Sequence, residues 1–162
     1  MAWTTPKIDW NNGELVTADD MNEIGGLLKK LMAPLAVASY TTPSDIVATP
    51  RDWSDIDSDN LNFTLDTTGG DVLAHFQGVI HDETHRGHTV GFNLEVDGVR
   101  QRGSNGIVSA GLDNDRQNVP IAFTELIRNL SAGTHTFKFQ WRSNQERAVR
   151  LKKGAQFWVR EI

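Results

Sequence analysis

Apolar residues recur at two different periods in the two parts of this chain. Near the start they fall at Met21, Ile24, Leu28, Leu31 and Leu35, which is the alternating spacing of three and four that lies along one helix face. This pattern predicts one short α-helix whose apolar seam is about two heptads long.

The predicted helix needs a partner to be stable. Gly25 and Gly26 interrupt it, each at a cost of about 0.8–1 kcal/mol against alanine, and isolated helices of this length are marginal in water. The seam either packs on the rest of its own chain or meets copies of itself. Pro34 and Pro43 bracket a short linker, which favours self-association. We therefore divide the chain into an arm plus helix (residues 1–33), a linker (34–44) and a head (45–162).

The head follows a period of two. Apolar and polar residues alternate over residues 61–66, 89–96 and 136–142, and Asp97-Gly98 is a strong hairpin signal. About eight to ten short strands follow one another with no room for crossover helices. The prediction is a mainly β chain with an antiparallel jelly-roll sandwich as its head. The predicted core consists of the inward positions Leu61, Phe63, Leu65, Phe76, Val90, Phe92, Leu94, Phe137, Phe139 and Trp141.

Composition excludes several classes of function. At 162 residues the chain has room for one principal domain and an appendage. It has no cysteine, which rules out disulfides, a thiol nucleophile and a cysteine zinc site. The net charge of −5 argues against a dedicated nucleic-acid binder. We expect no membrane span and no signal peptide, because no apolar run is long enough.

The first sixteen residues form an irregular arm that is rich in aromatic anchors. Trp3, Pro6, Ile8 and Trp10 lie in a segment without periodicity and with little capacity to bury itself. The two indoles either fold back on the helix or fill pockets in another protein, as aromatic anchors do at interfaces. We expect the second use, with the arm as a point of attachment.

The same segment resembles the start of many tailed-phage virion proteins, among them tail-fibre, neck and head-appendage components. The residues that carry this resemblance run from Trp3 to Lys7, then Trp10, and from Gly13 to Asn22. The head resembles the trimeric jelly rolls of phage fibre tips, which are akin to tumour-necrosis-factor-like and complement-type globular heads. The residues that carry this second resemblance are 68–72, 96–98, 130–137, 140–142 and 157–162.

The resemblance implies a homotrimer on a virion. Met21, Ile24, Leu28 and Leu31 are then the trimer seam, and Trp3, Pro6, Ile8 and Trp10 anchor the chain to a capsid, neck or tail protein. The outward head is expected to serve decoration or adhesion, with a host-surface glycan as a candidate ligand.

One histidine-rich segment has the residue types of a metal site. His81, His85 and His88 lie within eight residues together with Asp82 and Glu83. The alternative is a solvated loop between two strands, and we expect metal to be absent or incidental there. No other cofactor is expected.

Two charged segments have both a binding and a structural interpretation. Residues 55–66 have the alternating acids of a calcium loop, but Asn60 replaces the required glycine and Leu61 to Asp66 reads as a strand. A solvated acidic turn is the alternative. The basic residues towards the end of the chain either contact anionic glycans or phosphates or line a solvated hairpin: Arg142, Arg147, Arg150, Lys152 and Lys153.

The leading hypothesis is a structural virion protein without catalytic activity. The sequence holds neither a nucleophile elbow nor a phosphate loop. The alternative is a carbohydrate-binding module in which an exposed tryptophan such as Trp53 is the platform for a sugar ring.

Overall fold

A computed structural model of the chain describes residues 21–22, 37–82, 87–113, 117–145 and 147–162. The chain divides into two compact units, residues 1–34 and residues 35–162. In the first unit only Met21 and Asn22 are described, and both are helical. The second is called the β unit below. No helix in the described part of the chain is long and apolar enough to cross a membrane.

The β unit consists of two antiparallel sheets, each with six strands among the described residues. Sheet A contains β1 (Val37–Thr41), β2 (Ile46–Ala48), β5 (Gly70–His81), β9 (Asn118–Leu130), β11 (Val149–Leu151) and β12 (Gln156–Glu161). Sheet B contains β3 (Ser54–Asp55), β4 (Asn62–Thr67), β6 (His88–Val96), β7 (Val99–Arg100), β8 (Val108–Leu112) and β10 (Gly133–Ser143).

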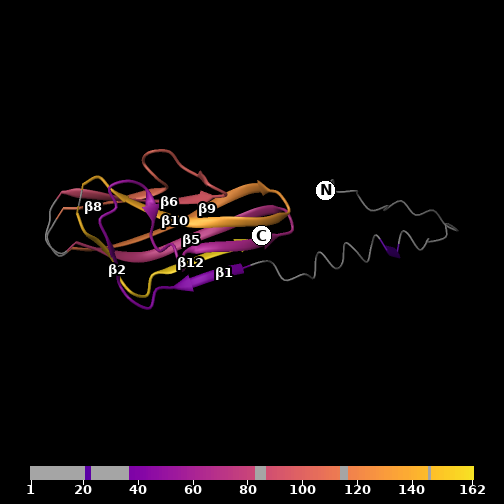
Figure 1. Cartoon of the computed structure of the whole chain (residues 1–162), viewed down its shortest axis with the longest axis horizontal. Helices are drawn as coiled ribbons and strands as arrows, with labels where there is room; N and C mark the ends of the chain where they lie inside the picture. Colours follow the sequence, from indigo (N-terminus) through magenta and orange to yellow (C-terminus); the bar gives the residue numbers. More distant parts are fainter. Residues whose placement is uncertain (1–20, 23–36, 83–86, 114–116, 146) are drawn as a thin grey trace. The chain divides into compact units, whose positions relative to one another are not determined.

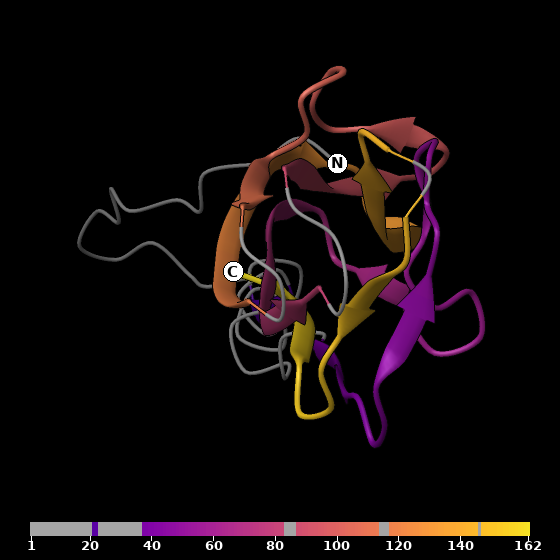
Figure 2. The same ribbon diagram turned by 90° about the vertical axis from the view of Figure 1, so that its left-hand side faces the viewer.

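The order of the strands is that of a jelly roll. Sheet A runs β1-β12-β5-β9 and sheet B runs β4-β10-β6-β8. The chain crosses between the sheets from β2 to β3, from β4 to β5, from β5 to β6, from β8 to β9, from β9 to β10 and from β10 to β11 (Figures 1 and 2). The predicted antiparallel jelly-roll sandwich is therefore confirmed for the β unit.

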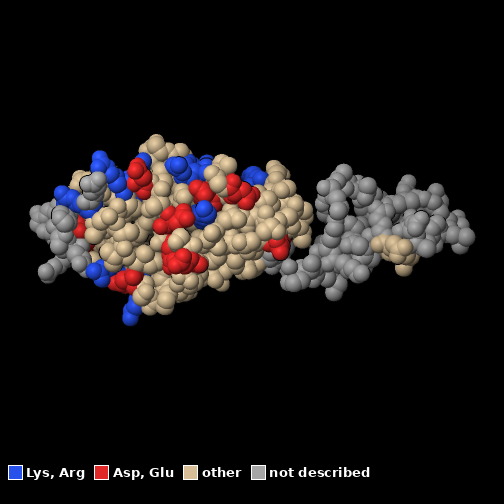
Figure 3. All heavy atoms as spheres, in the orientation of Figure 1, with Lys and Arg blue, Asp and Glu red and all other residues tan. Residues whose placement is uncertain are grey.

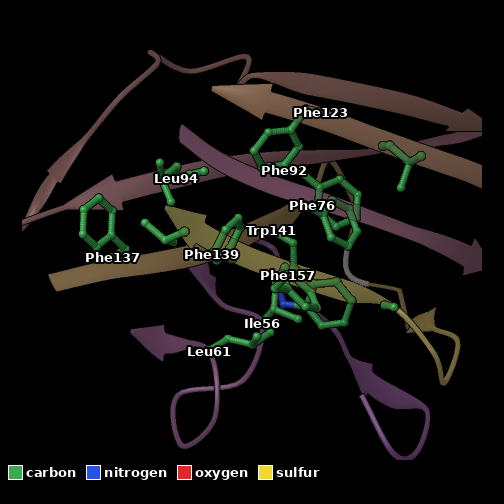
Figure 4. Close-up of a cluster of buried hydrophobic side chains, with 14 of the residues drawn as sticks. Ile56, Leu61, Phe76, Phe92, Leu94, Phe123, Phe137, Phe139, Trp141 and Phe157 are labelled. Atoms are coloured by element: carbon green, nitrogen blue, oxygen red, sulfur yellow. The ribbon is translucent and has the colours of Figure 1, made fainter. Parts of the chain in front are cut away.

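The core lies between the two sheets, and aromatic rings join them. Phe76 of sheet A stacks on Phe92 of sheet B at a centroid distance of 4.9 Å. Phe157 of sheet A meets Phe139 of sheet B edge-on at 5.1 Å (Figure 4). All ten predicted core residues are buried, which confirms the alternation on which they were chosen.

The hairpin after β6 also forms as predicted. Asp97 and Gly98 have φ values of 50° and 81°, and β6 pairs with β7 on either side of them. Two successive positive φ values are the requirement of a type I′ turn, which the Asp-Gly dipeptide meets.

The predicted linker is partly wrong. Residues 37–41 form β1, which pairs with β12 along its whole length, from Val37 opposite Arg160 to Thr41 opposite Gln156. Ala38 and Tyr40 face the core, but alanine and tyrosine at an edge give too weak an alternation to mark a strand. Pairing with β12, 119 residues away, decides the structure of this segment instead.

We expect the substitution Phe139→Ala to destabilise the β unit by about 3–5 kcal/mol, because it removes a ring that is 1 % exposed and in contact with three other phenylalanines. Chemical denaturation monitored by circular dichroism measures this loss. Val99→Ala is the matched control, since Val99 is 65 % exposed and its loss should cost less than about 0.5 kcal/mol. A loss below about 1 kcal/mol for Phe139→Ala would contradict the assignment of the core.

Candidate functional site

Most of the predicted seam and anchor residues lie outside the described residues. Ile24, Leu28 and Leu31 of the seam do so, as do all four anchor residues, Trp3, Pro6, Ile8 and Trp10. Met21 is described and is 60 % exposed. These two assignments therefore stay predictions.

The histidine-rich segment is less of a loop than the sequence suggests. β5 continues to His81 and β6 begins at His88. The Nδ1 atom of His81 lies 2.9 Å from Asn118 Oδ1 on the outer side of sheet A. His88 is buried and its Nδ1 atom lies 3.4 Å from a carboxylate oxygen of the fully buried Asp82. His85 lies outside the described residues.

His81 and His88 are thus held by different neighbours, one on an outer surface and one inside the sandwich. Within the described ranges there is no group of three metal-ligating side chains. We predicted that metal is absent or incidental at His81, His85 and His88, and this prediction stays untested.

The acidic segment 55–66 is built as a turn followed by a strand. Asp57 Oδ1 accepts hydrogen bonds from the backbone N–H groups of Asp59 and Asn60, each at 3.1 Å. Asp66 lies in β4 and accepts a hydrogen bond from the Thr134 hydroxyl. The acids therefore point to separate partners, as expected for the solvated acidic turn rather than for a calcium loop.

The basic residues near the end of the chain do not form one cluster. Arg150 and Lys152 both approach Asp45 Oδ2, at 3.2 and 3.6 Å. The backbone N–H of Lys153 donates to Asp45 Oδ1 and is the main cause that lowers the pKa of this carboxyl. Burial acts in the opposite direction, and Arg150 and Lys152 lower the pKa further. These charges hold the turn after β11 against the β1–β2 loop.

Arg142 lies elsewhere, with its guanidinium carbon 5.1 Å from the centroid of the Trp53 ring. Trp53 is half-buried rather than exposed. The expectation that Trp53 is exposed is therefore wrong, and its use as a sugar platform stays an untested alternative.

Ser131, His135 and Asp97 have the residue types of a nucleophile triad, but their hydrogen bonds do not suit that role. His135 Nδ1 lies 2.6 Å from Asp97 Oδ2, and His135 Nε2 lies 2.9 Å from the Ser131 carbonyl oxygen. A nitrogen that donates to a carbonyl cannot take a proton from the Ser131 hydroxyl, which is 3.4 Å away. The three residues clamp the turn before β10 to the β6–β7 hairpin.

This clamp shifts the titration of both partners. The hydrogen bond to Asp97 is the main cause that raises the pKa of His135, and burial opposes it. Burial alone would raise the pKa of Asp97, but hydrogen bonds from His135 and from the backbone N–H of Thr136 outweigh it and lower the pKa. Both shifts favour the charged forms, so the folded chain stabilises the charged carboxylate of Asp97 and the charged imidazole of His135 relative to the unfolded chain.

The outer face of sheet A carries few charges. Between the row at Leu73 and the row at Val79, none of the outward residues of β1, β12, β5 and β9 is Asp, Glu, Lys or Arg, except Arg160 at the edge of this area. We call the remaining positions the low-charge face: Val37, Ser39, Thr41, Leu73, His75, Gln77, Val79, Pro120, Ala122, Thr124, Leu126, Gln156 and Trp158.

Polar groups on the low-charge face pair sideways with one another. His75 stacks on Trp158 at 4.9 Å, and its Nδ1 atom lies 2.9 Å from Thr124 Oγ1. Gln77 Nε2 donates to Gln156 Oε1 at 2.6 Å. Because these groups use each other as partners, another surface can cover them with little loss of hydrogen bonding. A shallow hollow at one end of the face is lined by residues 77–79, 120–122 and Gly154.

The outer face of sheet B is charged by contrast. Lys138 Nζ lies 3.6 Å from Glu95 and 4.0 Å from Asp55, and Gln140 Nε2 donates to both of these carboxylates. Figure 3 shows acidic and basic side chains interspersed over the side of the β unit that it presents. Interspersed charges are typical of a solvated surface.

Comparison with known proteins does not assign a family. No protein-family model matches the chain, and no curated protein matches its sequence. Among solved structures, a tumour necrosis factor (Eiger) from S. frugiperda overlaps with a TM-score of 0.47 at 9% identity, covering 80% of this chain and 94% of the other. Dimeric latent PorU from Porphyromonas gingivalis overlaps with a TM-score of 0.42 at 8% identity. That overlap covers 80% of this chain and 13% of PorU.

Sequence reasoning did not find the low-charge face. The signal was present in β5 and β9, where Leu73, Val79 and Leu126 occupy outward positions that a solvated sheet fills with polar residues. The sequence places Trp158 in a predicted strand, but its contact with His75 depends on the register of β12 against β5.

We expect the ion pair between His135 and Asp97 to make stability depend on pH in a defined direction. Its contribution is fully present between the ordinary pKa values of the two groups, 3.8 and 6.5. It is lost as the pH rises through the raised pKa of folded His135, because the unfolded chain has already released that proton. It is also lost as the pH falls through the lowered pKa of folded Asp97.

Thermal melts of the wild type and of His135→Gln between pH 4 and pH 9 test this expectation. The difference in melting midpoint should be largest near pH 5–6 and should shrink above about pH 6.5. Asp97→Asn should flatten the dependence of the melting midpoint on pH in the same way. The double variant should show no further change in this pH dependence. A difference that stays constant over the whole range would contradict a charged pair.

Proposed function

We propose that this chain is a structural virion protein of a tailed phage, a homotrimeric fibre or appendage with an outward β head. The virion role rests on the resemblance of residues 3–22 to the start of such proteins. The observation that carries the proposed assembly is the low-charge face.

The composition of the low-charge face favours contact between copies. Trp158, Leu73, Leu126 and Val79 expose apolar surface there, and association removes such surface from water. A sheet outer face that faces water normally carries charged residues, as sheet B does in this molecule. A net charge of −5 makes copies repel one another at most other orientations. Contact between copies through the low-charge face therefore brings fewer charged side chains together than contact through the outer face of sheet B.

The number of copies comes from the two resemblances and not from the face. The fibre heads that the β unit resembles are trimers, and the seam Met21, Ile24, Leu28 and Leu31 suits a three-helix bundle as well as a dimer. In this proposal the helix and the low-charge face contribute to the same assembly, and the arm attaches it to a capsid, neck or tail protein.

The alternative, a carbohydrate-binding module that uses Trp53, has less support. Arg142 covers the ring that a sugar would need. A ring on the low-charge face, Trp158, is half-buried against His75. We therefore propose adhesion to a glycan as one property of the virion protein and not as a separate function.

We expect Leu126→Asp to separate the trimer without unfolding the β unit. The new carboxylate would be half-exposed in a single copy but buried without a partner in the assembly, which is strongly unfavourable. Light scattering after size exclusion should give three times 18.0 kDa for the wild type and a smaller mass for the variant.

Val99→Asp is the matched control, because it places the same charge on an exposed residue of β7 and should leave the mass unchanged. The double variant Ile24→Asp with Leu28→Asp tests the helix seam in the same assay. If Leu126→Asp keeps the wild-type mass while the seam variant loses it, the helix alone makes the assembly. A wild-type mass of 18.0 kDa would contradict the proposed trimer.

We expect deletion of residues 1–16 to abolish incorporation into particles and to leave the β unit folded. The arm carries the proposed anchors Trp3, Pro6, Ile8 and Trp10, whereas the core of the β unit is formed by residues 56–159. Melting curves and particle incorporation in a complementation assay measure the two effects. Normal copy number of the truncated chain on virions would show that attachment lies in the helix or the head.

A further inference from the structure

Arg142 is held in one orientation on the outer face of sheet B. Its guanidinium lies over the Trp53 ring at 5.1 Å, a distance typical of a cation–π contact. Such stacking uses the flat side of the guanidinium and leaves its N–H edges free to donate. Arg142 lies in β10, directly opposite Gly91 of β6, so its backbone is fixed by the sheet.

The Trp53 ring beneath it is seated in a slot made by two glycines. A Cβ atom at Gly91 would lie 3.3 Å from Trp53 Cη2, and one at Gly106 would lie 2.6 Å from the same atom. Gly106 also has a φ of 74°, which a residue with a side chain adopts only with strain. A side chain at Gly106 would clash with the ring, and one at Gly91 would be in tight contact with it, so glycine at both positions lets the ring lie against the sheet.

The charge of Arg142 is not compensated by a nearby acid. Among the described residues, Arg142 contacts the ring of Trp53, and no carboxylate lies within ion-pair distance of its guanidinium. Asp55 and Glu95, which lie on the same face, both contact Lys138 and Gln140 instead. An oriented, half-exposed guanidinium without an acidic partner is suited to an external anion.

The surroundings select the kind of anion. Asp55 and Glu95 with Lys138 leave a negative charge on the same face, which disfavours a polyanion such as nucleic acid. Two exposed neutral residues lie on the same outer face of sheet B as Arg142. Ser109 lies in the same cross-strand row, two strands or about 10 Å away, and the exposed Asn105 lies beside the Trp53 slot.

We propose that Arg142, stacked on Trp53, binds the carboxylate of an acidic saccharide, with Ser109 and Asn105 placed to meet its hydroxyl groups. A carboxylate matches the two parallel N–H donors of a guanidinium edge. The inference rests on the proposed adhesive head and gives its ligand a chemical class. It needs only the outer face of sheet B, which the proposed assembly leaves uncovered.

Nuclear magnetic resonance of the full-length chain tests the site through the indole N–H signal of Trp53, assigned with Trp53→Phe. Titration with sodium glucuronate should shift this signal in a saturable manner, whereas glucose should not. Arg142→Gln should weaken binding by at least about tenfold, and Arg142→Lys should also weaken it because lysine cannot donate two parallel bonds. Arg100→Gln, which removes an exposed arginine from β7 of the same sheet, should bind as the wild type does.

Three results would overturn the inference. The first is a Trp53 signal that glucuronate does not shift, and the second is equal binding by wild type and Arg142→Gln. The third is equal binding of acetate and glucuronate, which would show a site for a bare anion rather than for a saccharide. The sedimentation of the same samples reports the assembly separately, so a trimer that fails to bind contradicts this inference alone.

Discussion

The aromatic layer between the sheets is the interaction on which the rest of the β unit depends. Phe76 contacts Phe92 across the sandwich and Phe157 within its own sheet, and Phe157 in turn meets Phe139. Phe76 and Phe157 meet through the pairing of β5 with β12, two strands that are far apart in sequence, so the layer can form only when β5, β6, β10 and β12 are all paired in register. The same packing fixes which residues point inward, and therefore which residues form the two outer faces.

The two outer faces differ because only one of them resembles a solvated surface. On sheet B, Lys138 and Gln140 balance the carboxylates of Asp55 and Glu95, and Arg142 rests on Trp53. On sheet A, His75 and Trp158 lie among apolar and amide side chains that already pair with one another. In the proposed virion protein, this division gives one face to the contact between copies and leaves the other for a ligand.

The sequence predicted the inner face well and the outer faces poorly, for a physical reason. Alternation of apolar residues reports burial along one strand, so Phe139 and Trp141 could be placed without knowing their neighbours. It cannot report which residues meet across strands. Trp158 and His75 are 83 positions apart, and Arg142 meets Trp53 only because β3 pairs with β10. His88 is a further case, since a polar residue beside a loop gave no sign that it would be buried with Asp82.

The proposed assembly requires that the low-charge face is covered in solution. Hydroxyl-radical footprinting of the intact chain, read by mass spectrometry over a range of protein concentrations, measures this at Trp158 and Leu73. We expect both residues to become protected as the protein assembles, while the exposed Val99 of sheet B reacts equally at every concentration. Equal reactivity of Trp158 and Leu73 in the monomeric and assembled protein would show that this face remains open and would contradict its role as the contact between copies.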